Sequence, residues 1–273
     1  FNIAHNENKI TEMPDNYIEE NYTFGNGNYA YRREEGRPMG SFYGYRYKGV
    51  YQNKDATYAR DIEGNVMKDI SGNAIVMRNG SYTVAPGDAI YEDVNHDGVI
   101  NQYDIVYLGN SNPRLTGGAG LNVSYKQFKL SAIFYGRYGQ DVVNATRLNN
   151  ESMRGIDNQS TAVLRRWRNE GDQTDIPRAL YGEGYNTLGS DRFVEDASYL
   201  RLKSLSFTYR LPKKAIQRWG FNNIDVYVTG YNLFTWTKYT GQDPEVKTEN
   251  TYARDTATTP ASIQLVAGFN LSF

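Results

Sequence analysis

The chain has 273 residues, with 30 basic and 31 acidic side chains, 24 Tyr, 26 Gly and no Cys. Its near-neutral charge argues against nucleic acid or an anionic surface as a partner, and the lack of Cys excludes disulfides and cysteine-bound metals. No apolar run approaches the roughly 18 residues of a membrane helix. A soluble all-β protein or a transmembrane β-barrel remains, because barrel sequences are polar on average. The many Tyr favour the barrel, where aromatic girdles mark both membrane interfaces.

Period-two alternation of apolar and polar residues predicts about seven strands. They lie near 1–10, 40–52, 116–126, from 128 onward, 197–211, 224–233 and 262–273. The second carries Tyr43, Tyr45 and Tyr47 in one phase. The fifth changes phase between Leu202 and Leu205, which predicts a β-bulge.

The last strand alternates most regularly. We expect one face of this strand to meet lipid, with Leu265, Phe269, Leu271 and Phe273. The other face, with Gln264 and Asn270, is expected to meet the barrel lumen. Its length matches the roughly 9–11 residues of a tilted transmembrane strand. The predicted fold class is therefore all-β: the C-terminal strands of a large transmembrane β-barrel with long extracellular loops.

The connections between strands alternate in length. Long ones are predicted at about 53–115, 145–195 and 235–260, and short ones near 126–127 and 212–215. Barrels have long extracellular loops and short periplasmic turns, so we expect the long loops outside and the C-terminus on the periplasmic side. The segment 11–39 does not fit this pattern. Since there is no initiator Met or signal peptide, residues 1–273 are expected to be the C-terminal part of a longer protein.

One long loop contains a candidate calcium site. Oxygen-bearing side chains stand at positions 1, 3, 5, 9 and 12 of the stretch from Asp93 to Asp104, with Gly98 at position 6. This is the EF-hand spacing, in which Gly allows the sharp turn around Ca²⁺. The expected structural ligands are Asp93, Asn95, Asp97 and Asp104 through side chains and Val99 through its carbonyl. Asp104 departs from the pattern, because Glu would normally coordinate there with both oxygens. The alternative is an acidic turn in which Asx side chains cap the backbone.

No enzymatic constellation is evident in the sequence. The chain has two His and no Cys, and it contains no nucleophile elbow, P-loop or zinc-protease motif. No catalytic residue is therefore predicted, and substrate-binding residues are not identified. Trp167, which follows Arg165 and Arg166, is interpreted as an anchor of a long loop in preference to a platform for a sugar ring.

Several motifs in a fixed order resemble one family. The stretch from Tyr91 to Asn101, followed by the motifs 108–114, 166–178, 197–203 and 230–236, is similar to the C-terminal barrel of SusC/RagA-type TonB-dependent transporters of Bacteroidetes. The similarity runs from about residue 36 to 273. The calcium loop can be carried over because all of its positions are present, whereas substrate contacts vary with the loops.

The resemblance implies an outer-membrane importer for a glycan or a peptide. Such barrels have about 22 strands around a plug and work with a SusD-like surface lipoprotein as a lid. The plug, the rest of the barrel and the contact to the TonB complex would lie outside this chain. The competing interpretation is a secreted, calcium-stabilised carbohydrate-binding β-sandwich, because the spacing from Asp93 to Asp104 also fits such modules.

Overall fold

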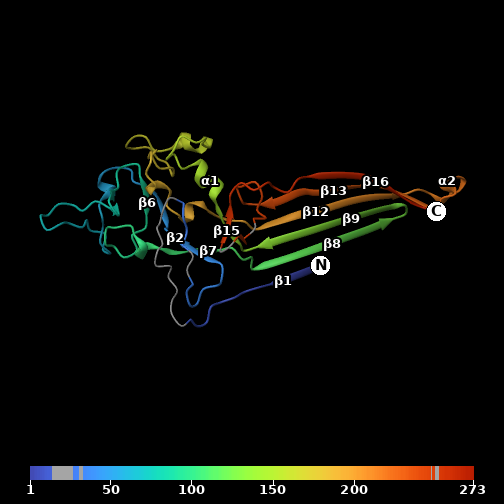
Figure 1. Ribbon diagram of the computed structural model, residues 1–273, viewed down its shortest axis with the longest axis horizontal. Coiled ribbons are helices and arrows are strands. Elements are labelled where there is room, and N and C mark those ends of the chain that lie inside the picture. Colours follow the sequence, from blue (N-terminus) through green and yellow to red (C-terminus); the bar gives the residue numbers. More distant parts are fainter. Residues whose placement is uncertain (14–26, 31–32, 247, 250–251) are drawn as a thin grey trace.

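The computed structural model describes residues 1–13, 27–30, 33–246, 248–249 and 252–273. Its main feature is one antiparallel six-stranded sheet in the order β1-β8-β9-β12-β13-β16, which extends to one side in Figure 1. The strands are β1 (Asn2–His5), β8 (Leu115–Tyr125), β9 (Phe128–Tyr138), β12 (Tyr199–Arg210), β13 (Asn223–Thr237) and β16 (Gln264–Ser272). Four of them have 9 to 12 residues and β13 has 15, so each of the five can cross a bilayer at a tilt.

The sheet has one apolar and one polar face because side chains alternate along every strand. Residues paired across strands share a face, and the row Leu121, Ala132, Leu205, Gly230 and Leu265 is apolar. We call this the outward face. Leu265 and Phe269 on it are 73% and 68% exposed, with Leu271 and Phe273 also exposed, as the sequence predicts. Gln264 and Asn270 share the opposite face, which we call the lumenal face, with polar partners such as Asp225.

The predicted bulge in the fifth strand is confirmed. The pairing of β12 shifts between Leu202 and Ser204 against both neighbours, β9 and β13. One extra residue returns the later apolar side chains to the outward face. Leu200 and Phe207 therefore face the same side although their sequence spacing is odd.

Aromatic residues close the outward face at both ends. Tyr125 pairs with Phe128, which pairs with Tyr209, next to the short turns. Tyr138 and Trp236 lie at the other end, beside the long connections. Such belts are typical of the two membrane interfaces, and the apolar rows between them match the bilayer interior.

The predicted strand at 40–52 does not belong to the large sheet, and this part of the prediction is wrong. It divides into β2 (Ser41–Gly44), paired with β7 (Val106–Asn110), and β3 (Tyr47–Val50), paired with β6 (Ala89–Tyr91). Their side chains are largely buried among the loops, with Phe42 fully covered. Four residues are too few to cross a membrane, so six strands form the large sheet instead of seven.

This correction also accounts for the segment 11–39. With 40–52 removed, one connection runs from β1 to β8, and all three long connections leave the same end of the sheet (Figure 1). Residues 14–26 and 31–32 of that segment lie outside the described residues. The short connections at 126–127 and 211–222 lie at the opposite end, the second with α2 (Lys213–Ile216) and η6 (Gln217–Trp219).

The long connections pack into one body with its own cores. Its further strands are β4 (Arg78–Asn79) paired with β5 (Tyr82–Thr83), and a four-stranded sheet of β11 (Val194–Asp196), β10 (Asp141–Asn144), β15 (Tyr252–Asp255) and β14 (Thr248–Glu249). Its helices are α1 (Ala145–Asn150), η1 (Asp55–Thr57), η2 (Gln102–Asp104), η3 (Thr161–Arg165), η4 (Tyr185–Thr187) and η5 (Asp191–Phe193). None of the helices in the described residues is long and apolar enough to cross a membrane.

Much of the Tyr content serves this body. Tyr45, Tyr51, Tyr91 and Tyr185 are buried in one cluster, which differs from the expectation that Tyr mainly forms girdles. The first and second connections are joined by Asp88, whose fully buried carboxylate accepts a bond from Arg178 Nε at 2.7 Å. A buried carboxylate requires such a partner.

A clamp of charges fixes the third connection on the lumenal face. Arg201 of β12 is only 2% exposed and donates to Asp243 at 2.5 Å, Glu245 at 2.9 Å and the Thr235 hydroxyl at 2.8 Å. Lys203 also contacts Glu245 at 2.8 Å. Segment 238–246 therefore lies over β12 and β13 on the lumenal side.

The competing β-sandwich is not supported. A sandwich covers the apolar face of one sheet with a second sheet about 10 Å away. Within the described residues the outward face carries exposed Leu, Phe and Trp side chains from end to end, and no second sheet lies over it (Figure 1).

The depth of each outward position predicts how an added charge is tolerated. Leu265 lies in a middle row, whereas Phe269 lies in the aromatic row near the short turns. We expect Leu265→Arg to destabilise the assembled protein in vesicles by about 2–4 kcal/mol and Phe269→Arg by about 0–1 kcal/mol. Urea unfolding measures this, with the lumenal change Asn270→Arg as the control. Equal stability of the Leu265 and Asn270 variants would contradict the two-faced sheet.

Removal of Arg201 should release the clamp. Arg201→Met leaves Asp243 and Glu245 without their shared cation, and loss of one partner of a buried pair costs about 3 kcal/mol or more. Hydrogen exchange of 238–246 in the assembled protein should become faster. Arg210→Met breaks the exposed Arg210–Asp225 pair and is the control, with little expected effect. Unchanged exchange in the Arg201 variant would show that the clamp does not hold the segment.

Candidate functional site

A polar pocket lies beside the clamped segment. It has a volume of about 310 Å³ and is formed by residues of the second and third connections. Its lining consists of Asn144, Thr146, Arg147, Asn150, Glu151, Ser160, Thr240, Gly241, Gln242, Asp255 and Ala257. Because 240–242 belong to the segment held by Arg201, the clamp also positions one wall of the pocket.

Local structure explains how α1 presents its part of the wall. The Asn144 side chain caps the helix by accepting the N–H of Arg147 at 2.9 Å, as Asn favours at this position. Arg147 then reaches Glu151 at 3.0 Å and Glu195 at 3.3 Å. The Asp255 carboxylate accepts the hydroxyl of Tyr239 at 2.6 Å.

Arg147 and Glu151 are thus ion-paired within the protein, and the Asp255 carboxylate is held by hydrogen bonds from Tyr239 and the N–H of Ala257. The remaining groups are amides and hydroxyls, which both donate and accept. The buried Ser160 Oγ has no hydrogen-bond partner in the part of the chain that the structure describes, and such a group is expected to find one. The pocket therefore suits an uncharged segment of a ligand that is rich in hydrogen-bonding groups. Among the described residues, no aromatic side chain lines it.

The predicted calcium loop forms a tight wrap. Gly98 has a φ of 78°, the left-handed conformation that Gly adopts without strain, so the sharp turn is confirmed. The Asp93 carboxylate accepts the N–H of Gly98 at 2.8 Å, and Asp97 accepts that of Val99 at 2.8 Å. Ile100, which follows, is fully buried.

Asp104 closes the loop. Its carboxylate is fully buried and accepts the N–H groups of Val94 and Asn101, both at 2.8 Å. Burial raises the pKa of Asp104; these two hydrogen bonds oppose the rise, and the charges of Asp93 and Asp97 add to it. The three carboxylates therefore repel one another.

The five predicted calcium ligands lie together, but their side chains are not arranged around an ion. Asp93, Asn95, Asp97, Val99 and Asp104 share one loop, but the carboxylates point to backbone N–H groups. Among the described residues no group of three or more His, Cys, Asp or Glu side chains is placed to hold a metal ion. His96 is exposed, with its Nδ1 3.3 Å from the Arg60 carbonyl oxygen. Calcium binding thus stays a prediction.

The polar pocket could not be predicted from the sequence. Its residues come from 144–160 and 240–257, two stretches without periodicity that the large sheet brings together. By contrast, Trp167 fits the predicted anchoring role, since its ring packs against Gly87, leaving no room for a Cβ there.

Comparison with known proteins identifies relatives across the chain. No protein-family model matches. TonB-dependent receptor P3 of Formosa agariphila is 33% identical over 257 residues, which are 92% of this chain and 23% of that protein. TonB-dependent receptor P26 of the same organism is 36% identical over 159 residues, or 58% of this chain and 16% of the relative.

Solved structures of similar fold belong to the same kind of protein. The structure of the RagAB peptide transporter matches over 99% of this chain and 26% of the RagAB chain, with 26% sequence identity and a TM-score of 0.70. The chain spans about a quarter of the length of that structure and 23% of receptor P3. The sheet, the order of the motifs and these matches show that the chain belongs to the SusC/RagA-type TonB-dependent transporters and forms a portion of their β-barrel.

Proposed function

We propose that the whole transporter imports a peptide across the bacterial outer membrane, driven by the TonB complex through a plug that lies outside this chain. The observation that carries the proposal is the polar pocket at the loop end of the lumenal face. Its amides and hydroxyls match the alternating N–H and C=O groups of a peptide main chain. The part of its lining that the structure describes contains no aromatic ring, which favours a peptide over a glycan, and the similar RagAB is a peptide transporter.

We infer the orientation from the lengths of the connections. The long ones would be extracellular and the short ones periplasmic, together with the C-terminus, as in barrels of this type. The polar pocket then faces the medium from which a nutrient enters. The proposed role is transport, and no residue of the chain is assigned to catalysis.

Removal of the exposed side-chain amides of the pocket should weaken peptide binding. Asn150→Ala combined with Gln242→Ala removes up to two hydrogen bonds of roughly 1 kcal/mol each, so peptide binding by the full-length transporter should weaken by about tenfold or more. Asn122→Ala is the control, because Asn122 lies on β8 and bonds Ser131. Peptide affinity unchanged in the double variant would contradict the assignment, and tight binding of an oligosaccharide in place of peptides would favour a glycan.

We also propose that a SusD-like surface lipoprotein closes over the long connections as a lid. Support comes from the shared position of all three connections at one end of the sheet (Figure 1). The full-length transporter should therefore co-purify with a lipoprotein in mild detergent. Isolation of the transporter alone under all such conditions would argue against a lid.

The loop from Asp93 to Asp104 is proposed to bind one structural Ca²⁺. The EF-hand spacing, the turn at Gly98 and the mutual repulsion of the carboxylates support this role, since a cation would remove the repulsion. Binding would require the side chains of Asp93, Asn95, Asp97 and Asp104 to turn toward the ion.

Asp97→Ala should abolish calcium binding while the barrel stays assembled, because its strands pair independently of the loop. Calorimetric titration of the full-length transporter with Ca²⁺ measures the first effect, and resistance to unfolding in detergent the second. Asp61→Ala, in a separate exposed turn, is the matched control. Absence of calcium binding to the unaltered protein would leave the alternative, an acidic turn stabilised by backbone caps.

A further inference from the structure

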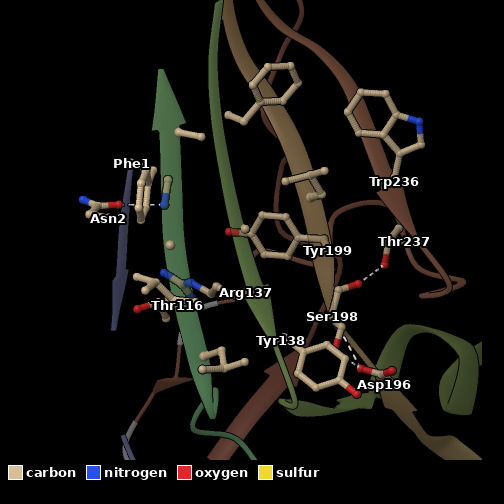
Figure 2. A pocket seen from close by; sticks show the side chains of 18 of the residues that line it. Phe1, Asn2, Thr116, Arg137, Tyr138, Asp196, Ser198, Tyr199, Trp236 and Thr237 are labelled. Atoms are coloured by element: carbon tan, nitrogen blue, oxygen red, sulfur yellow. Dashed lines mark hydrogen bonds between the residues drawn. The ribbon is translucent and has the colours of Figure 1, made fainter. Parts of the chain in front are cut away.

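A hollow of about 860 Å³ interrupts the outward face at its loop end. Figure 2 shows the hollow with Phe1 and Asn2, at the start of β1, on one side and Trp236 of β13 on the other. Its outward-facing walls come from Ile3, Leu115, Phe134, Leu200 and Trp236. These side chains are apolar, so the hollow is continuous with the apolar band of the sheet.

Two glycines create the hollow. One row across the sheet reads Ile3, Gly117, Gly136, Leu200 and Trp236, so two adjacent strands carry no side chain at its centre. A Cβ on Gly117 would lie 2.8 Å from the Asn2 carbonyl oxygen, and one on Gly136 would lie 2.8 Å from that of Tyr199. Side chains are therefore excluded by the backbone of the neighbouring strands, and Ala119 in the next row extends the shallow floor.

The loop end of the hollow is polar and carries a cation, Lys238, and an anion, Asp196. The Tyr138 hydroxyl and the Trp236 indole N–H lie at this end of the hollow, as the polar groups of interface aromatics do. Lys238 also lines the hollow, and within the described residues its ammonium has no ion-pair partner. The Asp196 carboxylate nearby is already bonded by the backbone N–H and the hydroxyl of Ser198. Asp196 thus keeps its negative charge but is held by Ser198, whereas the Lys238 ammonium is available to an anionic group from outside the chain.

We propose that the hollow binds one acyl chain of a phosphate-bearing membrane lipid, with the phosphate beside Lys238. The position selects this occupant: the hollow opens on the face that meets lipid, between the apolar rows and the interfacial aromatics. A chain that enters at Trp236 can follow the bare backbone of Gly117 and Gly136 toward Ala119. The proposal does not depend on the transported cargo.

The test uses the full-length transporter, stripped of lipid in detergent and titrated with phosphatidylglycerol by native mass spectrometry. Ala119→Trp fills the hollow, and Ala267→Trp adds the same ring to the outward face away from it. Because each buried CH₂ of an acyl chain contributes about 0.8 kcal/mol, loss of two or more weakens binding by about tenfold or more. We expect this loss for Ala119→Trp and none for Ala267→Trp. If Ala119→Trp does not assemble, Leu200→Trp fills the same hollow.

The headgroup is tested separately. Lys238→Gln should weaken phosphatidylglycerol binding several-fold and leave binding of diacylglycerol, which lacks the phosphate, unchanged. Equal lipid binding by the unaltered, Ala119 and Ala267 proteins would overturn the proposal. It would also be overturned if the unaltered protein bound the two lipids equally and Lys238→Gln had no effect.

Discussion

The hydrogen bonds of the backbone are the constraint on which this structure depends. A chain in lipid cannot leave N–H and C=O groups without partners, so strands must pair along their whole lipid-exposed length. In this protein β8, β9, β12 and β13 each pair on both sides. Pairing fixes the register, and register assigns every side chain to lipid or lumen. The bulge after Leu202 shows this constraint, because one extra residue in β12 restores the apolar face.

The connections are stabilised in a different way. Outside the apolar band, water can satisfy the backbone, and the long segments fold into a body held by buried aromatics and paired charges. Asp88 with Arg178 joins two connections, and Arg201 with Asp243 and Glu245 joins the third to the lumenal face. The second of these links couples the wall of the barrel to the polar pocket. The sheet thereby positions the loops that form the polar pocket.

The sequence predicted those parts of the fold in which local pattern and environment agree. The hairpin of β8 and β9 and the terminal strand alternate because one face meets lipid and the other does not. The segment 40–52 alternates too, but its Tyr43 and Tyr45 are buried in the loop body, so periodicity alone misassigned it. The turn at Gly98 was predictable from spacing. The polar pocket was not, because Asn150 and Gln242 meet only through long-range packing, for which a single sequence has no signal.

The central claim is that the outward face of the sheet lies in lipid, and spin labels on this part of the protein, which has no Cys of its own, can measure it. Cys residues are introduced one at a time at the positions from Gln264 to Leu271 and labelled with a nitroxide, and the transporter is reconstituted into vesicles. The relaxation of each nitroxide then measures its accessibility to oxygen and to a water-soluble nickel complex. Oxygen accessibility should rise and fall with a period of two, with maxima at Leu265, Ala267, Phe269 and Leu271. Nickel accessibility without alternation, and high at Leu265, would contradict the account.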